Sequence, residues 1–105
     1  MPRIIVPGTT PVHEWFIPFQ EKDIKSLLIS YGQNDLELFV KEKKDCTFSE
    51  NTVSVQLTQK ETLQFLNGTK AQAQLNVVNT NGDRFTTVCE DIDVDTRILH
   101  PEVIE

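Results

Sequence analysis

The stretch Thr52-Val53-Ser54-Val55-Gln56-Leu57 opens the part of the chain that decides the fold class, which runs from Thr52 to Val94. Polar and apolar residues alternate along it, as in a half-buried strand. The next segment, Thr58-Gln59-Lys60-Glu61, has the spacing of a capping box and predicts a short helical turn. Ala71-Gln72-Ala73-Gln74-Leu75-Asn76-Val77 alternates again, and Asn81-Gly82 predicts a type I′ hairpin turn. Strand, helical crossover, strand and hairpin, in this order, are typical of the second half of an immunoglobulin-like sandwich.

The first half of the chain is also predicted to consist of strands. The expected segments are an edge segment or arm at Ile4–Val6, then Val12–Phe19, Ile24–Tyr31, Leu36–Lys41 and Cys46–Phe48, with a turn at Gly32–Asp35. Pro18 predicts an edge strand or a kink near the end of Val12–Phe19. We therefore predict an all-β, immunoglobulin-like antiparallel β-sandwich of about six or seven strands with one short helical crossover turn.

A chain of 105 residues has the length of one such domain. We expect a single β-sandwich over residues 1–95, with residues 1–8 as an N-terminal arm or edge segment. Residues 96–105 contain Pro101 and little periodicity, so a C-terminal tail is expected there.

One face of the strands forms the predicted core. Its members are apolar residues at alternate positions: Trp15, Ile17, Leu27, Ile29, Leu38, Val53 or its neighbours, Ala73, Leu75, Val77, Ile92 and Val94. The crossover should add Leu63, together with Phe65 or Leu66. Within Phe85-Thr86-Thr87-Val88 the apolar phase slips by one residue, which predicts a β-bulge.

Four apolar residues fall on the opposite phase, which should face water: Phe16, Leu28, Phe39 and Val78. Two interpretations are open. Either loops bury some of them or the strand phase differs from the one assigned, or they form an exposed patch for an oligomer or assembly interface. We take these four as the candidate interface residues.

The charge balance bears on partners and location. A net charge of −6 argues against binding to nucleic acid or to an anionic membrane surface. No apolar run approaches a membrane span, and Ile4–Val6 is too short for a signal peptide after Met1-Pro2-Arg3. The expected location is the cytoplasm in which the chain is made, or a particle that leaves it.

The two cysteines do not suggest a metal or redox site. Neither Cys46 nor Cys89 belongs to a C-x-x-C pair, so zinc and thiol redox chemistry are not expected. We expect reduced, partly buried thiols, and a disulfide between them is the alternative.

The acidic run Asp91-x-Asp93-x-Asp95 has the spacing of the first ligands of a calcium loop. Thr96 stands where such a loop needs glycine, and Ile92 and Val94 suit a strand. A solvated strand face is therefore the preferred interpretation, and a weak cation site is the alternative. No cofactor or metal is predicted.

No catalytic constellation is evident in the sequence. His13 and His100 have no nucleophile at a suggestive spacing and are interpreted as polar surface residues. No glycine-rich phosphate loop occurs, so we expect that the protein is not an enzyme.

The opening segment, Gly8-Thr9-Thr10-Pro11-Val12-His13-Glu14-Trp15-Phe16-Ile17-Pro18-Phe19, carries a family resemblance. It resembles the first strand of small phage and prophage proteins of Gram-positive bacteria, in which a G-x-T-P turn leads into an alternating strand. The likeness continues through residues 24–33, 45–48, 53–63 and 77–82. These proteins resemble the immunoglobulin-like N-terminal module of phage baseplate proteins. The resemblance implies a structural protein associated with a virion or its tail, and no enzyme.

Two functions remain in view. The first is a structural or assembly protein of a phage or prophage particle, tail or baseplate associated. It would contact copies of itself or other phage structural proteins, in the host cytoplasm during assembly. The alternative is a small binding module that recognises a host protein or a glycan. A glycan-binding site would present exposed aromatics and amides in a groove, whereas an assembly protein would present an apolar face or edge. Phe16, Leu28 and Phe39 favour the first.

Overall fold

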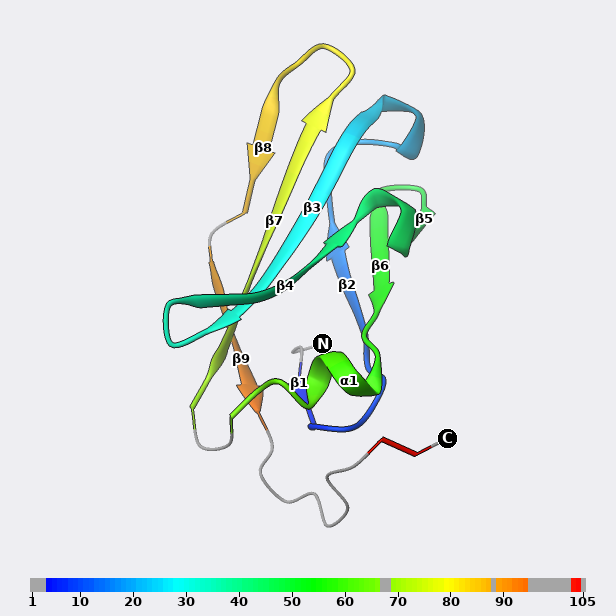
Figure 1. Ribbon diagram of the computed structural model, residues 1–105. Helices are drawn as coiled ribbons and strands as arrows, with labels where there is room; N and C mark the ends of the chain where they lie inside the picture. The colour runs from blue at the N-terminus through cyan, green and yellow to red at the C-terminus, as the bar shows by residue number, and fades with distance from the viewer. Residues whose placement is uncertain (1–3, 67–68, 88, 95–102, 105) are drawn as a thin grey trace.

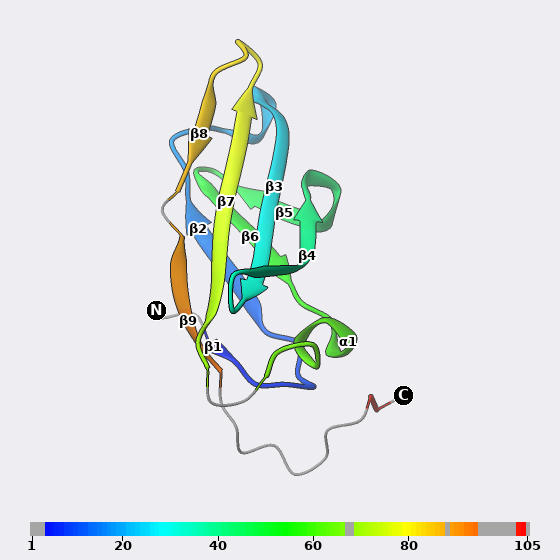
Figure 2. The same cartoon turned by 60° about the vertical axis from the view of Figure 1, so that its left-hand side comes forward.

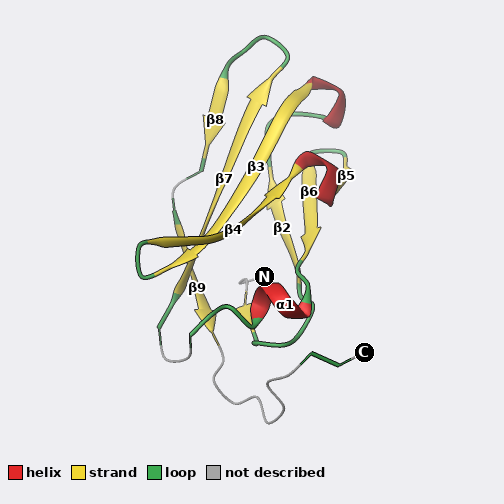
Figure 3. Ribbon diagram, viewed as in Figure 1, coloured by secondary structure: helices red, strands yellow, loops and turns green. Residues whose placement is uncertain are grey.

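The computed structural model describes residues 4–66, 69–87, 89–94 and 103–104. Its strands form two facing sheets (Figure 1). The strands are β1 Ile4–Ile5, β2 Val12–Phe16, β3 Ile24–Gln33, β4 Leu36–Glu42, β5 Cys46–Ser49, β6 Thr52–Gln56, β7 Ala71–Asn79, β8 Arg84–Thr86 and β9 Glu90–Val94. Two 3-10 turns, η1 Glu21–Asp23 and η2 Lys43–Asp45, and one helix, α1 Gln59–Thr62, connect them (Figure 3).

The two sheets have the wiring of an immunoglobulin-like sandwich. The larger sheet has the order β1-β9-β7-β3-β4, with β8 also paired to β7, and the smaller has the order β2-β6-β5. The chain passes between sheets after β1, β2, β4 and β6, and Figure 2 shows β2 and β6 behind β7 and β3. The predicted fold class is confirmed. The described residues form nine strands, more than predicted, and the larger sheet is mixed because β1 runs parallel to β9.

The core lies between the sheets and follows the predicted face. It consists of Ile5, Trp15, Ile17, Ile24, Leu27, Ile29, Tyr31, Val53, Val55, Leu57, Phe65, Ala71, Ala73, Leu75, Val77 and Ile92. Leu38 and Val94, which were also predicted core members, are half-buried against it. Burial of a large apolar side chain contributes roughly 1.5–3 kcal/mol, so this shared face stabilises the sandwich.

The helical crossover forms as predicted. The Thr58 hydroxyl accepts a hydrogen bond from Glu61 N at 3.2 Å, and Glu61 Oε1 accepts one from Thr58 N at 2.8 Å. After α1 the chain buries Phe65, whereas Leu63 is half-buried and Leu66 is 62% exposed. Of the two residues offered by the prediction, Phe65 therefore joins the core and Leu66 does not.

Both predicted hairpin turns form, but the turn at Asn81-Gly82 is not of type I′. A type I′ turn needs positive φ at both central residues. Between β7 and β8 only Gly82 has it, at 88°, so the type I′ prediction for Asn81-Gly82 is wrong. Gly82 N donates to Asn79 O at 3.0 Å, which gives a type I turn followed by a left-handed glycine. The β3–β4 turn has the type I′ signature instead, with φ of 55° at Asn34 and 63° at Asp35.

Three register shifts occur in the larger sheet, one of them between Ile24 and Ser26 where β3 pairs with β7. The shift predicted after Phe85 is confirmed: β7 advances three residues from Ala73 to Asn76, while the facing chain spans four from Thr86 to Glu90. The third shift falls between Tyr31 and Gly32, opposite an extra residue in β4. A Cβ on Gly32 would lie 2.6 Å from Leu36 O, so this close approach of the two backbones requires glycine.

The two termini are described in part. The expected N-terminal edge segment is β1, which pairs with β9. Of the predicted tail at 96–105, the structure describes Val103 and Ile104. Gln59 binds the Ile104 backbone twice, because Ile104 N donates to Gln59 Oε1 at 2.8 Å and Gln59 Nε2 donates to Ile104 O at 2.9 Å.

Candidate functional site

The structure does not gather the four candidate interface residues into one patch. Phe16 lies on β2 in the smaller sheet and is 86% exposed. Leu28 on β3 and Val78 on β7 lie on the outer face of the larger sheet, where both line the same groove. Phe39 on β4 packs against the core instead. Only Leu28 and Val78 are therefore brought together.

The phase predicted for Phe39 is wrong. Its ring stacks on Tyr31 with centroids 5.0 Å apart and meets Phe65 edge-on at 5.8 Å. The extra residue in β4 opposite Tyr31 and Gly32 causes the error, because one inserted residue moves the side chains that follow it to the opposite face. Val40, the next residue of β4, is 37% exposed.

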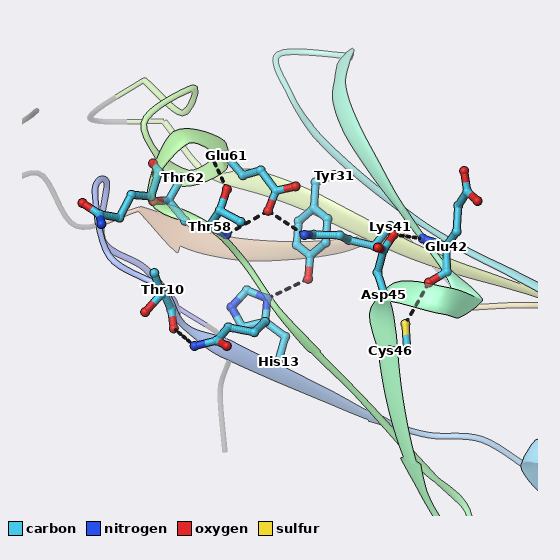
Figure 4. Close-up of polar contacts among 12 residues, drawn as sticks. Thr10, His13, Tyr31, Lys41, Glu42, Asp45, Cys46, Thr58, Glu61 and Thr62 are labelled. Carbon is cyan, nitrogen blue, oxygen red and sulfur yellow. Dashed lines mark hydrogen bonds and ion pairs between the residues drawn. The ribbon is translucent and has the colours of Figure 1, made fainter. Parts of the chain in front are cut away.

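His13 is buried, not a surface residue as predicted. Its Nδ1 lies 2.8 Å from the Tyr31 hydroxyl and its Nε2 lies 3.1 Å from Ile4 O (Figure 4 shows the Tyr31 contact). A carbonyl oxygen only accepts, so Nε2 carries a proton and donates it to Ile4 O, while Nδ1 shares the second hydrogen bond with the Tyr31 hydroxyl. His13 thus ties β1, β2 and β3 together. His100 lies outside the described residues.

Around α1, an ion pair connects the capping box to the larger sheet (Figure 4). Lys41 on β4 is 8% exposed, and its Nζ lies 2.7 Å from Glu61 Oε1. The same oxygen accepts from Thr58 N, so Glu61 caps α1 and neutralises Lys41 together. Burial strengthens such a charge-assisted contact and makes loss of either partner costly.

Two further polar side chains hold the crossover in place. The buried Thr62 hydroxyl accepts from Gly8 N at 2.9 Å and lies 2.9 Å from Thr9 O, to which it donates. Gln33, 3% exposed, donates to Leu66 O at 2.9 Å and to Thr69 O at 2.8 Å, and accepts from Leu66 N at 2.6 Å. We call Gln33, Lys41, Thr58, Glu61 and Thr62 the crossover cluster. Its polar atoms are committed to the fold.

The outer face of the larger sheet carries a groove with a different character. Its volume is about 480 Å³ and four cationic side chains line it: Lys25 from β3, Lys43 and Lys44 from η2, and Arg84 from β8. Leu28 and Val78 contribute apolar surface. We call this feature the basic groove. The sequence concealed it because the contributing segments are far apart along the chain.

Hydrogen bonds hold two of the four cations in position. Lys43 Nζ donates to Ile24 O at 2.8 Å, which fixes η2 against the start of β3. Arg84 donates from Nη2 to Asn76 Oδ1 at 2.8 Å and from Nε to Thr86 Oγ1 at 3.3 Å. A guanidinium has five N–H donors, so Arg84 keeps capacity for an anion. Lys44 makes an exposed 3.9 Å ion pair with Glu42, which contributes little.

The cysteines are free thiols, as preferred from the sequence. Cys46 is half-buried, as predicted, whereas Cys89 is exposed. Burial, followed by the charge of Asp45, raises the pKa of the Cys46 thiol to about 11, against an opposing effect of Lys41. Cys46 therefore stays protonated at neutral pH and is a poor nucleophile.

The acidic strand is described at Asp91 and Asp93, and Asp95 lies outside the described residues. Both described carboxylates are exposed on β9. Asp93 Oδ1 lies 3.3 Å from Lys70 Nζ, and Asp91 Oδ1 accepts from Gln72 Nε2 at 3.4 Å. Within the described part of the chain, no three His, Cys, Asp or Glu side chains are grouped to hold a metal ion. These contacts fit the solvated strand face.

Comparisons with known proteins identify no family. A scan against protein-family models found no match, and a search of curated proteins found none either. Among the described residues, no helix is long and apolar enough to span a membrane.

Proposed function

We propose that this protein is a non-enzymatic structural or assembly module that acts through protein–protein contacts. We place it in the tail or baseplate of a phage or prophage particle, with further copies or other particle proteins as partners, and in the host cytoplasm during assembly. This setting rests on the resemblance of its turn and strand patterns to small phage proteins.

The exposed side of β2 is the observation that carries the contact role. Phe16 and Val12 are 86% and 57% exposed and lie four residues apart on one face of this strand. β2 is also an edge of the smaller sheet, since among the described strands it pairs with β6 alone. An edge strand that presents large apolar side chains invites a partner strand or surface.

Burial of Phe16 and Val12 would contribute enough free energy to anchor an interface. Full burial of a Phe or Val side chain contributes roughly 1.5–3 kcal/mol, and a few such residues can dominate the affinity of an interface. Phe16 is the aromatic residue among the exposed large apolar side chains of the described chain. A glycan site is less well supported. Neither the basic groove nor a smaller groove of about 160 Å³ beside Gly32 and Gln72 has an exposed aromatic lining residue.

The test is sedimentation of the wild type and of Phe16→Ser over a range of concentrations. We expect the wild type to self-associate or to bind a co-expressed particle protein, and Phe16→Ser to weaken that association by at least about 1 kcal/mol. Leu36→Ser is the matched control, since Leu36 is 64% exposed on β4, in the other sheet.

Two results would contradict the proposal. One is an equal loss of association in the Leu36 and Phe16 variants, which would remove the special role of β2. The other is purified particles that lack the protein by mass spectrometry, which would reject the structural role in the particle.

A further inference from the structure

We infer that the basic groove binds an acidic segment of a partner protein, in which apolar residues accompany the carboxylates. The groove lies on the outer face of the larger sheet, whereas Phe16 lies on the smaller sheet. This inference goes beyond the contact at β2 and names the chemistry of a second partner surface.

The positive charge of the groove favours an acidic ligand. Lys25, Lys43, Lys44 and Arg84 line the groove with Glu42, which leaves a local balance of +3 in a chain whose net charge is −6. The rest of the chain has six cationic and fifteen acidic side chains. An acidic segment is repelled by most of this surface and attracted at the groove, so charge complementarity selects the site.

The fixed positions of two of the cations also favour binding. The bonds of Lys43 to Ile24 O and of Arg84 to Asn76 and Thr86 hold these two side chains in place before a ligand arrives. Preorganised donors lose less conformational entropy on binding. Arg84 can offer its planar fork to a carboxylate, while Lys25 and Lys44 are exposed and can close on the ligand.

The apolar lining of the groove indicates that the ligand carries apolar side chains besides its carboxylates. Leu28 is 38% exposed, Val78 is half-buried, and both line the groove together with the cations. A volume of about 480 Å³ has room for a few side chains. A segment in which carboxylates alternate with apolar residues would pair its carboxylates with the cations and pack its apolar residues against Leu28 and Val78.

A protein ligand fits these features better than a nucleic acid. Proteins that hold single strands stack bases on aromatic side chains, and no aromatic residue lines this groove. Glu42 would face the phosphates, and the acidic remainder of the chain would repel a long polyanion.

The experiment is a fluorescence-anisotropy titration of the whole protein with a labelled octapeptide of alternating glutamate and leucine. We expect saturable binding at low salt that weakens as salt is raised. Parallel titrations use alternating glutamine and leucine, glutamate alone, and an oligothymidylate of equal length. Each should bind at least tenfold more weakly than the glutamate–leucine peptide.

Variants locate the site. Lys25→Glu combined with Lys44→Glu should weaken binding at least tenfold. Lys22→Glu combined with Lys60→Glu changes the net charge equally outside the groove and should change binding less than twofold. Leu28→Ser should weaken binding of the glutamate–leucine peptide but not of glutamate alone. Circular dichroism checks that every variant is folded.

Several results would overturn the inference. These are no binding by the wild type, equal losses in the two lysine pairs, or stronger binding of the oligothymidylate. Self-association that is lost only in the Lys25 and Lys44 pair would identify a second copy as the occupant, in place of a different protein. Phe16→Ser should bind the peptide normally, so the β2 proposal and this one can fail separately.

Discussion

The crossover cluster and the basic groove use polar side chains in opposite ways. In the cluster, Gln33 and Thr62 are buried and bonded to backbone atoms distant in sequence, and Lys41 is neutralised by Glu61. In the groove, the cations line the surface, and no hydrogen bond or ion pair joins the Lys25 side chain to another residue of the described chain. Buried polar groups must be satisfied to keep the fold, whereas exposed cations can serve a ligand. Substitutions should therefore affect stability in the first region and binding in the second.

The largest effect should come from Gln33→Leu. This change keeps most of the side-chain volume but leaves Leu66 N, Leu66 O and Thr69 O without their partner. We expect a loss of unfolding free energy on the order of 2–4 kcal/mol, measured by urea denaturation. Gln72→Leu is the control, because Gln72 is half-buried on the outer face and makes weaker contacts. Equal shifts in the two midpoints would contradict a special structural role for the buried Gln33 amide.

Thr62→Val should have the next largest effect. The valine fills the same space but cannot accept from Gly8 N or donate to Thr9 O. We expect a loss of about 1–3 kcal/mol, compared with about 1 kcal/mol for Thr58→Ala, which removes the exposed cap. A thermal or urea melt of both variants gives the order. A smaller loss in the Thr62 variant would show that the exposed Thr58 cap stabilises the fold more than the buried Thr62 hydroxyl does.

The smallest effect should come from Lys25→Gln combined with Lys44→Gln in the groove. Neither side chain supports the fold through a short contact, since the Lys44–Glu42 ion pair spans 3.9 Å and is exposed. The unfolding free energy should stay within about 0.5 kcal/mol of the wild type. A larger loss would mean that these cations stabilise the fold, which would weaken their assignment to a ligand.

Local patterns predicted much of the fold. The capping box at Thr58 formed because its two hydrogen bonds are made within four residues. Alternation identified Trp15, Leu27 and Leu75 as core, because a strand has only two faces. The slip after Phe85 could be recognised because it changes the phase inside one strand segment.

The candidate site was harder to predict, because the decisive features are not local. An inserted residue in β4 placed Phe39 in the core, and nothing in Leu36–Glu42 alone reveals where its partner strand shifts register. His13 looks like a surface residue until Tyr31 and Ile4 are placed beside it. The exposure of Phe16 was predicted from strand phase, but its position on an edge of the smaller sheet required the strand order.

The sequence by itself determined the all-β class, the crossover and most of the core face, since these follow from periodicity and from bonds between near neighbours. Only the tertiary structure decided which charges meet. Lys25, Lys43 and Arg84 come from three separate segments, and the pairing of β3 with β4 and β7, and of β7 with β8, brings them to one groove. Charge interactions depend on distance in space and not on distance along the chain. An acidic chain can for this reason carry a basic site that its composition conceals.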